Sequence, residues 1–494
     1  MTVQLQDAKQ ISIADNSIAN HFHTKIVCTL GPATESRSAI ESLLAQGASV
    51  FRLNFSHSNY EWATKTADLA RQVAASMDRP LALLQDLCGP KIRLSHVGPQ
   101  VSEIEEGQVI RLTTDQFWNG EEAENNKYDL STNYEMLLND VQVADQLLIN
   151  DGRVALTVEE IYQDHLVAKV TRGGKVEVRK GLNLPGVALS TPSVTEKDWQ
   201  DLQWGIENQV EYVALSFVRE STEILEVKQA LLDANCSAQV ISKIERPEAI
   251  ENIDAIIEAS DGIMVARGDL GLETDFARVP LLQKDLIKRC RLAAKPVITA
   301  TQVLDSMVET SIPTRAEVSD VANAILDGSD AIMLSNETAV GKHPEAVVRV
   351  IRQVAEQTES SMPVWKPEEF SDNHWGNQEA VADAAAAAVL HMKAKAVVAF
   401  TESGRTARAM ARYHLPVPIY AVTNNPATYR QLSLSYGIVP VFSPQIVSVV
   451  QLLEEIDEQA KQRDWAQSGD WLALVSTFHE TAKQVDTLHL HCVS

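Results

Sequence analysis

The chain has 494 residues, and its 45% hydrophobic content is enough for large buried cores in roughly three domains. The 43 basic and 67 acidic side chains give a formal net charge of −24, which argues against nucleic acid as a general partner but permits a local basic pocket. Five scattered cysteines without a CxxC pair exclude a disulfide framework and a zinc ribbon. We therefore expect a cytoplasmic protein without a signal peptide or a membrane span.

Strand and helix patterns alternate along much of the chain. Apolar runs rich in β-branched residues predict eight strands, at Thr24–Leu30, Ser49–Phe55, Leu81–Leu87, Tyr212–Val218, Gln239–Glu245, Gly262–Ala266, Pro296–Thr301 and Asp330–Ser335. Most are followed by a helical pattern, such as Ser36–Gln46, Glu248–Ala259 or Pro344–Gln357. This repeating βα order predicts a closed (β/α)8 TIM barrel, with a doubly wound open sheet as the alternative.

Two further units complete the predicted organisation. An all-β stretch interrupts the repeat between the third and fourth strands, which predicts a β-barrel lid domain over the C-terminal face of the barrel. After a polar, proline-bearing linker the alternation resumes and predicts a C-terminal open α/β domain. The expected plan is a tail at 1–23, a catalytic barrel at 24–88 and 190–362, a lid at 89–189 and the α/β domain at 363–494.

Polar side chains follow several of the predicted barrel strands, whose ends meet at one mouth. Glu245 and Asp269 would be carboxylates on neighbouring strands, and oxygen ligands without His or Cys favour Mg²⁺ or Mn²⁺. Arg52 and Lys243 would add positive charge, and Gly268 would let backbone N–H groups approach an anion closely. Together these groups suit an anionic, phosphorylated substrate.

Each of these residues also has a plainer explanation. Lys243 and Glu245 could form a surface ion pair, and Asp269 could cap the following helix. The compatible chemistry of six strand ends favours a shared site over separate structural roles.

Segments spread over nearly the whole chain resemble the pyruvate kinase family, in a bacterial-type form. They include "TKIVCTLGPAT", "FRLNFSH", "SKIERPEAIENIDAI", "MVARGDLG" and "TATQVLDSM", in family order from about residue 24 to the C-terminus. The resemblance implies transfer of the phosphoryl group of phosphoenolpyruvate to ADP, which gives pyruvate and ATP. It also implies a Mg²⁺ or Mn²⁺ cofactor, a homotetramer and a phosphorylated allosteric effector.

The resemblance assigns roles to individual residues. Lys243, Arg52 and Thr301 are implied to be catalytic, and Glu245 and Asp269 to hold the divalent metal. The implied substrate-binding residues are Arg52, Lys243, Gly268, Asp269, Thr301 and Ser335. The implied nucleotide-binding residues are Asn54, Phe55, Ser56, His57, Arg93 and Lys180.

The position of the monovalent cation departs from the family pattern. Its matching ligands would be Asn54, Ser56, Asp86 and the carbonyl of Leu87. Members of the family that need K⁺ typically have Thr where Leu87 stands and Glu where Lys91 stands. Because a lysine ammonium could supply the missing charge, we predict that K⁺ is not required. The alternative is that Lys91 is a solvated lysine at the lid hinge.

The implied effector site is a loop after the predicted strand Ala396–Phe400. Hydroxyl and N–H groups in this loop suit a phosphate. The anionic Glu402 weakens the case for a bisphosphate and favours a monophosphorylated sugar or AMP. The candidate residues are Thr401, Ser403, Gly404, Arg405 and Thr406.

Two rival functions remain open at this point. A barrel lysine could form a Schiff base, as in class I aldolases. A non-catalytic paralogue could bind phosphometabolites without turnover, but it should have lost at least one of four residues that are all present. These four are Lys243, Glu245, Asp269 and Thr301.

Overall fold

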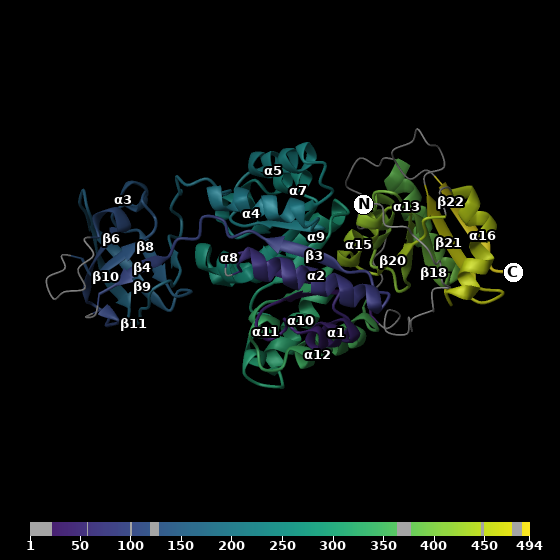
Figure 1. Cartoon of the computed structure of the whole chain (residues 1–494), viewed down its shortest axis with the longest axis horizontal. Coiled ribbons are helices and arrows are strands. Elements are labelled where there is room, and N and C mark those ends of the chain that lie inside the picture. Colours follow the sequence, from purple (N-terminus) through teal and green to yellow (C-terminus); the bar gives the residue numbers. More distant parts are fainter. Residues whose placement is uncertain are drawn as a thin grey trace.

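The computed structural model describes residues 22–56, 58–98, 101–118, 128–362, 377–445, 449–476 and 487–494. The lid strands lie at one end of the long axis, the barrel lies in the middle and the C-terminal sheet lies at the other end (Figure 1). Across these ranges, no helix has both the length and the apolar character needed to cross a bilayer.

Eight parallel strands close the central barrel in the order β1-β17-β16-β15-β14-β13-β3-β2. Closure follows from β1, which pairs with both β2 and β17, so the barrel is confirmed and an open sheet is excluded. Nearly every strand residue is buried, because helices cover the outside and side chains fill the inside. The strands are β1 (Lys25–Thr29), β2 (Val50–Asn54), β3 (Ala82–Asp86), β13 (Tyr212–Leu215), β14 (Gln239–Ile244), β15 (Gly262–Ala266), β16 (Val297–Ala300) and β17 (Ala331–Leu334).

Side-chain caps start several of the barrel helices. Ser36 accepts a hydrogen bond from the Ala39 N–H, and Thr195 and Thr314 each form a capping box. The helices of the barrel region are α1 (Arg37–Gln46), α2 (Tyr60–Ser76), α4 (Glu196–Glu207), α5 (Ser221–Asp233), α6 (Pro247–Glu251), α7 (Ile253–Ala259), α8 (Arg267–Glu273), α9 (Val279–Leu292), α10 (Arg315–Asp327), α11 (Asn336–Ala339) and α12 (Pro344–Glu359).

The single helix predicted at Glu248–Ala259 is wrong, because α6 and α7 are separated at Asn252. The Asn252 side-chain amide donates a hydrogen bond to the Arg219 carbonyl at 3.0 Å. This bond connects the break in the helix to the segment that follows β13. It is a tertiary contact, so the local periodicity of the sequence cannot reveal it.

The inserted residues form a barrel-like sheet of seven strands in the order β12-β8-β9-β10-β6-β7-β4. Its two edges meet, because the Leu94 N–H donates to the Lys180 carbonyl at 2.9 Å and the Leu182 N–H donates to the Ile92 carbonyl at 3.0 Å. The elements of this region are β4 (Leu94–Val97), β5 (Glu103–Ile104), β6 (Val109–Thr114), β7 (Leu130–Thr132), α3 (Leu137–Asp140), β8 (Gln146–Ile149), β9 (Val154–Ile161), β10 (Leu166–Arg172), β11 (Gly174–Lys175) and β12 (Leu182–Asn183).

The C-terminal region is the expected open α/β sheet, with strand order β20-β19-β18-β21-β22. Alternate residues of β18 pack in two separate cores, so α13 and α16 cover opposite faces of the sheet. The elements are α13 (Asn377–Met392), β18 (Ala396–Phe400), α14 (Arg405–Ala411), β19 (Ile419–Thr423), α15 (Pro426–Gln431), β20 (Ile438–Phe442), α16 (Val449–Gln462), β21 (Trp471–Ser476) and β22 (Thr487–Cys492).

Polar contacts join the C-terminal region to the barrel where the barrel strands begin. Tyr212, the first residue of β13, donates its hydroxyl to the Gln431 carbonyl at 2.5 Å. The Tyr436 N–H donates to Asp330, which directly precedes β17, at 2.9 Å. The C-terminal ends of the barrel strands therefore face away from this region and toward the lid (Figure 1).

We expect Tyr212→Phe to lower the thermal unfolding midpoint of the full-length chain. The substitution removes a buried donor and leaves the Gln431 carbonyl without it, at a cost of about 1–3 kcal/mol. Differential scanning fluorimetry measures the midpoint, and Tyr162→Phe, at an exposed tyrosine of the lid, is the matched control. Equal midpoints for Tyr212→Phe and the control would show that this bond does not stabilise the interface.

Candidate active site

A largely buried ammonium, on a side chain that is 12% exposed, lies at the barrel mouth. Lys243 in β14 places its Nζ atom 2.9 Å from Glu245 Oε1 and 3.3 Å from Asp86 Oδ1. The same nitrogen donates a hydrogen bond to Ser216 Oγ at 2.7 Å. Lys243 thus joins the ends of β3, β13 and β14, as the convergence of strand ends predicts.

A second cation lies beside it and shares one of its carboxylates. Arg52 in β2 donates from Nε to Asp86 Oδ2 at 2.6 Å and from Nη1 to Thr29 Oγ1 at 3.0 Å. Asp86 therefore bridges the two predicted cations, so Arg52 and Lys243 are fixed relative to each other before any ligand binds.

The surroundings hold this cluster in a charged state. Burial opposes the ionisation of Asp86, but Arg52 and Lys243 outweigh it and hold the pKa of Asp86 below its usual value. Burial likewise disfavours the ammonium of Lys243, yet Asp86 and Glu245 outweigh it and raise the pKa of Lys243. Lys243 is therefore a cation at neutral pH. A Schiff-base lysine needs a lowered pKa, so this environment disfavours the aldolase alternative.

The two predicted metal carboxylates have oxygen atoms that accept no hydrogen bond from the described residues. Glu245 Oε2 accepts a hydrogen bond from the Phe217 N–H at 2.7 Å, whereas its buried Oε1 has no suitably directed donor despite the nearby Lys243. Burial, followed by the charge of Lys243 and then that of Asp269, determines the pKa of Glu245, and the net effect raises it. Asp269 lies in the first turn of α8, and its carboxylate forms no hydrogen bond or ion pair with another described residue.

These two carboxylates fit a hard divalent cation. No group of three or more His, Cys, Asp or Glu residues is placed to enclose a metal within the described ranges. Mg²⁺ characteristically binds through one or two carboxylates and completes its shell with water and substrate oxygens. Glu245 and Asp269 therefore suit Mg²⁺ or Mn²⁺ better than a metal that needs a complete protein cage.

Thr301 and Gly268 meet at the ends of β16 and β15. The Gly268 N–H donates to Thr301 Oγ1 at 2.7 Å, and this hydroxyl donates to the Ala300 carbonyl at 2.7 Å. A Cβ atom at Gly268 would lie 3.3 Å from Thr301 Oγ1, so glycine permits this close approach. Thr301 has a φ of 65°, a strained conformation that is concentrated at functional sites.

Ser335 follows β17, and the structure does not join it to the charged cluster. Its N–H donates to Glu337 Oε2 at 2.7 Å, and Glu337 Oε1 accepts from the Leu304 N–H at 3.2 Å. Glu337 thereby links the ends of β16 and β17 on this side of the mouth.

The predicted nucleotide-binding residues fall into two groups. At the end of β2, Asn54 Oδ1 accepts from the Ser56 N–H at 3.1 Å, while the buried Phe55 ring packs 4.9 Å from the Trp204 ring. The Phe55 N–H donates to the Asp86 carbonyl at 3.0 Å and its carbonyl accepts from Lys197 Nζ at 3.1 Å, so neither its ring nor its backbone is free in this structure. His57 lies outside the described residues.

The second group, Arg93 and Lys180, lies in the lid. Arg93 Nη1 donates to the Arg179 carbonyl at 2.8 Å, and Lys180 Nζ lies 3.6 Å from Glu177 Oε2. These contacts stay within the lid, so the structure does not connect the two side chains to the barrel cluster.

The predicted monovalent-cation position is partly occupied by protein contacts. Leu87 presents its carbonyl to the hydroxyl of Ser216, which donates to it at 2.7 Å. Asp86 is engaged by both Arg52 and Lys243. The ammonium of Lys91 forms no hydrogen bond or ion pair with any described residue, so the structure does not bring it to the cluster.

The predicted effector loop precedes α14 in the C-terminal region. Thr401 Oγ1 accepts from the Gly404 N–H at 2.9 Å, and Arg405 Nε donates to Ser403 Oγ at 3.3 Å, while Thr406 is buried. Gly404 has a φ of 82°, which favours glycine. This loop lies near the start of β14, remote from the charged cluster at the other end of the strand.

Two residues of the cluster were missed by the sequence-based prediction. Thr29 and Ser216 lie at the ends of the first and fourth barrel strands, and they bond Arg52 and Lys243. Applying the strand-end rule to all eight strands would have found both.

Two family models match most of the chain. The model "Pyruvate kinase, barrel domain" matches residues 21–348, and "Pyruvate kinase, alpha/beta domain" matches residues 379–491. Curated proteins named pyruvate kinase from Staphylococcus aureus strains MRSA252 and COL are each 41% identical to this chain over 461 residues. Each alignment covers 92% of this chain and 77% of the relative. A barrel mouth with converging cations and carboxylates and these two family matches lead to one conclusion: the chain belongs to the pyruvate kinase family.

Proposed function

We propose that this chain catalyses the transfer of a phosphoryl group from phosphoenolpyruvate to ADP at the barrel mouth, with pyruvate and ATP as the products. The observation that carries the proposal is the largely buried Lys243 ammonium, held between Asp86 and Glu245 and beside Arg52. Phosphoryl transfer depends mainly on positioning and on positive charge around the phosphoryl oxygens. Lys243 and Arg52 supply that charge without reorganisation during the reaction.

The two carboxylates have a separate role in this proposal. Glu245 and Asp269 would hold Mg²⁺ or Mn²⁺, which when bound neutralises negative charge on the substrates. Two observations support this role: Glu245 Oε1 accepts no hydrogen bond, although Lys243 Nζ lies 2.9 Å away, and the Asp269 carboxylate has no hydrogen bond or ion pair among the described residues. No histidine or cysteine ligand is needed, because a hard cation prefers oxygen.

Hydroxyl and backbone groups complete the site for the substrate acid. Gly268, Asp269, Thr301 and Ser335 would orient phosphoenolpyruvate. When the phosphoryl group leaves, the enolate carbon must take up one proton to give pyruvate. We assign to Thr301 the positioning of the water that delivers this proton, because its hydroxyl lies at the end of β16 beside Gly268.

The nucleotide would lie between the barrel and the lid. Asn54, Ser56 and His57 would bind it from the end of β2, with the buried Phe55 anchoring this segment in the core, and Arg93 and Lys180 would contact its phosphates from the lid. Because the contacts of Arg93 and Lys180 stay within the lid, this role requires the lid to bring them toward the mouth.

A coupled assay with phosphoenolpyruvate and ADP tests the reaction directly. We expect pyruvate formation that a chelator abolishes and that excess Mg²⁺ restores, with no effect of borohydride. Inactivation by borohydride in the presence of a carbonyl substrate would instead support the Schiff-base alternative. Binding of phosphoenolpyruvate without turnover would support the non-catalytic paralogue.

We expect full activity in K⁺-free buffer. Lys91 does not reach the cluster in this structure, but once substrates are bound its ammonium would supply the positive charge that K⁺ provides in other members of the family. Steady-state rates with K⁺ replaced by tetramethylammonium measure this. Lys91→Glu should create a dependence on K⁺, whereas Lys65→Glu, on the exposed face of α2, should not. A many-fold loss of wild-type activity without K⁺ would refute the prediction.

The proposal extends to the regulation and the assembly of the chain. A phosphorylated effector, either a monophosphorylated sugar or AMP, would bind Thr401, Ser403, Gly404, Arg405 and Thr406. The chain would form a homotetramer in the cytoplasm. One contact supports communication from this loop: Arg408 in α14 donates to the side chain of Gln239, the first residue of β14, at 3.2 Å.

A further inference from the structure

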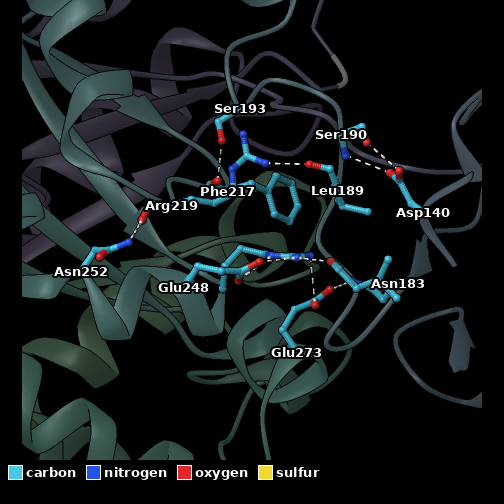
Figure 2. Close-up of polar contacts among 12 residues, drawn as sticks. Asp140, Asn183, Leu189, Ser190, Ser193, Phe217, Arg219, Glu248, Asn252 and Glu273 are labelled. Carbon is cyan, nitrogen blue, oxygen red and sulfur yellow. Dashed lines mark hydrogen bonds and ion pairs between the residues drawn. The ribbon is translucent and has the colours of Figure 1, made fainter. Parts of the chain in front are cut away.

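The lid rejoins the barrel through residues 184–193, here called the return linker, and two arginines bind its backbone. Figure 2 shows one of them, Arg219, beside Leu189. Arg246 Nη2 donates to the Val187 carbonyl at 2.7 Å, and Arg219 Nη1 donates to the Leu189 carbonyl at 2.8 Å. Arg219 follows β13 and Arg246 follows β14, so the linker is held from two neighbouring strand ends.

Arg246 also connects the two segments that carry the proposed metal carboxylates. It directly follows Glu245, and its Nη1 donates to Glu273 Oε2 at 3.1 Å. Glu273 ends α8, the helix whose first turn contains Asp269. The side chains of Arg246 and Glu273 are only 3% and 2% exposed. One buried ion pair therefore joins the segment of Glu245 to the segment of Asp269.

The ion pair between Arg246 and Glu273 contacts the lid at a second point. Glu273 Oε1 accepts a hydrogen bond from Asn183 Nδ2 at 3.3 Å (Figure 2). Asn183 lies in β12, the last strand of the lid sheet. The lid is thus bound directly through Val187 and indirectly through Asn183.

The geometry of the guanidinium couples these contacts. Arg246 Nε and Nη2 also donate to Glu248 at 3.3 and 3.0 Å, so the planar group holds three partners at once. A buried guanidinium loses free energy when a donor becomes unpaired. A shift of the return linker away from Arg246 would therefore disturb the orientation of this group and of Glu273.

A separate hydrogen-bond path links the linker to Glu245. Ser193 Oγ lies 2.9 Å from the Phe217 carbonyl, and the Phe217 N–H donates to Glu245 Oε2. Phe217 has a φ of 57°, an uncommon conformation for a bulky residue. This strained residue therefore contacts the return linker on one side and a proposed metal ligand on the other.

We propose that Arg246 is a positioning residue that sets the lid and the Glu245 and Asp269 carboxylates together. The proposal rests on the proposed function, because it takes these carboxylates as metal ligands. Its consequence is that a displaced lid leaves the metal site poorly formed, so that the metal site is complete only when the lid is in place to deliver the nucleotide.

The test replaces Arg246 with lysine in the full-length chain. Lysine keeps the charge, but it cannot bind Val187, Glu248 and Glu273 in one plane. We expect Mn²⁺ affinity without substrates, measured by electron paramagnetic resonance of free Mn²⁺, to fall by roughly 10-fold or more. Hydrogen–deuterium exchange of the return-linker amides, followed by mass spectrometry, should become faster.

Arg219→Lys is the matched control. Arg219 binds the linker at Leu189 but contacts neither Glu273 nor Glu245, so this variant should speed linker exchange and lower Mn²⁺ affinity much less than Arg246→Lys does. A loss of Mn²⁺ affinity as large as that of Arg246→Lys would overturn the proposal, since any loosening of the linker would then suffice. Wild-type Mn²⁺ affinity in Arg246→Lys would overturn it as well.

If Arg246→Lys does not fold, Asn183→Ala tests the same coupling between the lid and the metal carboxylates. It removes only the lid-side donor to Glu273, and we expect faster linker exchange with a smaller loss of Mn²⁺ affinity. No change in either quantity would contradict the proposal. Failure of the proposed function is distinguishable, because it appears as absent turnover in the wild type, whereas Mn²⁺ binding and amide exchange need no turnover.

Discussion

Lys243→Met lowers kcat for phosphoenolpyruvate and ADP by about three orders of magnitude or more, because it removes a main electrostatic group of the site. The ammonium lies 2.9 Å from Glu245 and 3.3 Å from Asp86. Methionine has a similar length but no charge, so the phosphoryl oxygens lose a positive group that was fixed before the reaction. A coupled assay at saturating substrate measures the effect.

The fold should survive this substitution in its main features. Asp86 keeps its bond to Arg52, and burial already favours the protonated form of Glu245. Lys228→Met, at a partly exposed lysine of α5 that pairs with Asp261, is the matched control and should retain nearly full turnover. Near-normal kcat in Lys243→Met, with circular dichroism unchanged, would remove Lys243 from the mechanism.

Glu245→Gln raises the Mg²⁺ concentration needed for half-maximal activity by roughly 10-fold or more, because fewer charged oxygens remain to bind the ion. The amide is close in shape to the carboxylate and can still accept the hydrogen bond from the Phe217 N–H. The predicted loss is therefore one of charge at the ion and not one of packing. Asp269→Asn should shift the titration in the same direction.

A Mg²⁺ titration of initial rates measures the shift, and direct Mn²⁺ binding checks it without turnover. Glu258→Gln, on the exposed surface of α7, is the control and should titrate like the wild type. An unchanged titration for both Glu245→Gln and Asp269→Asn would show that the ion is held elsewhere.

Local sequence patterns were enough to predict the elements of the barrel. β15 runs over Gly262–Ala266 exactly as the apolar run predicts, and α1 begins directly after its cap Ser36. Both follow from near-neighbour effects, namely side-chain burial and capping of free N–H groups. The helix predicted across Asn252 is wrong because a bond to Arg219, from another element, lies at the break.

The residues of the site could also be chosen from the sequence, because parallel strands of a barrel end at one mouth. That rule brought Arg52, Lys243 and Glu245 together, and the resemblance to a family added their expected roles. The strand-end rule could not predict that Asp86 bridges both cations, or that the Phe55 ring packs in the core. Those outcomes depend on side-chain directions at the strand ends, which the alternation of residues does not determine.

The order of βα units and the polar strand ends were determined by the sequence alone, whereas the pairing of β1 with both β2 and β17 decided that the barrel closes. Only the tertiary structure decided the partners of those polar groups, such as Ser216 for Lys243 and Val187 for Arg246. The physical reason is distance along the chain: Val187 and Arg246 are 59 residues apart, and their bond forms only when the lid has returned to the barrel. Patterns within a few residues specify elements, whereas bond geometry and burial across elements specify charge states and couplings.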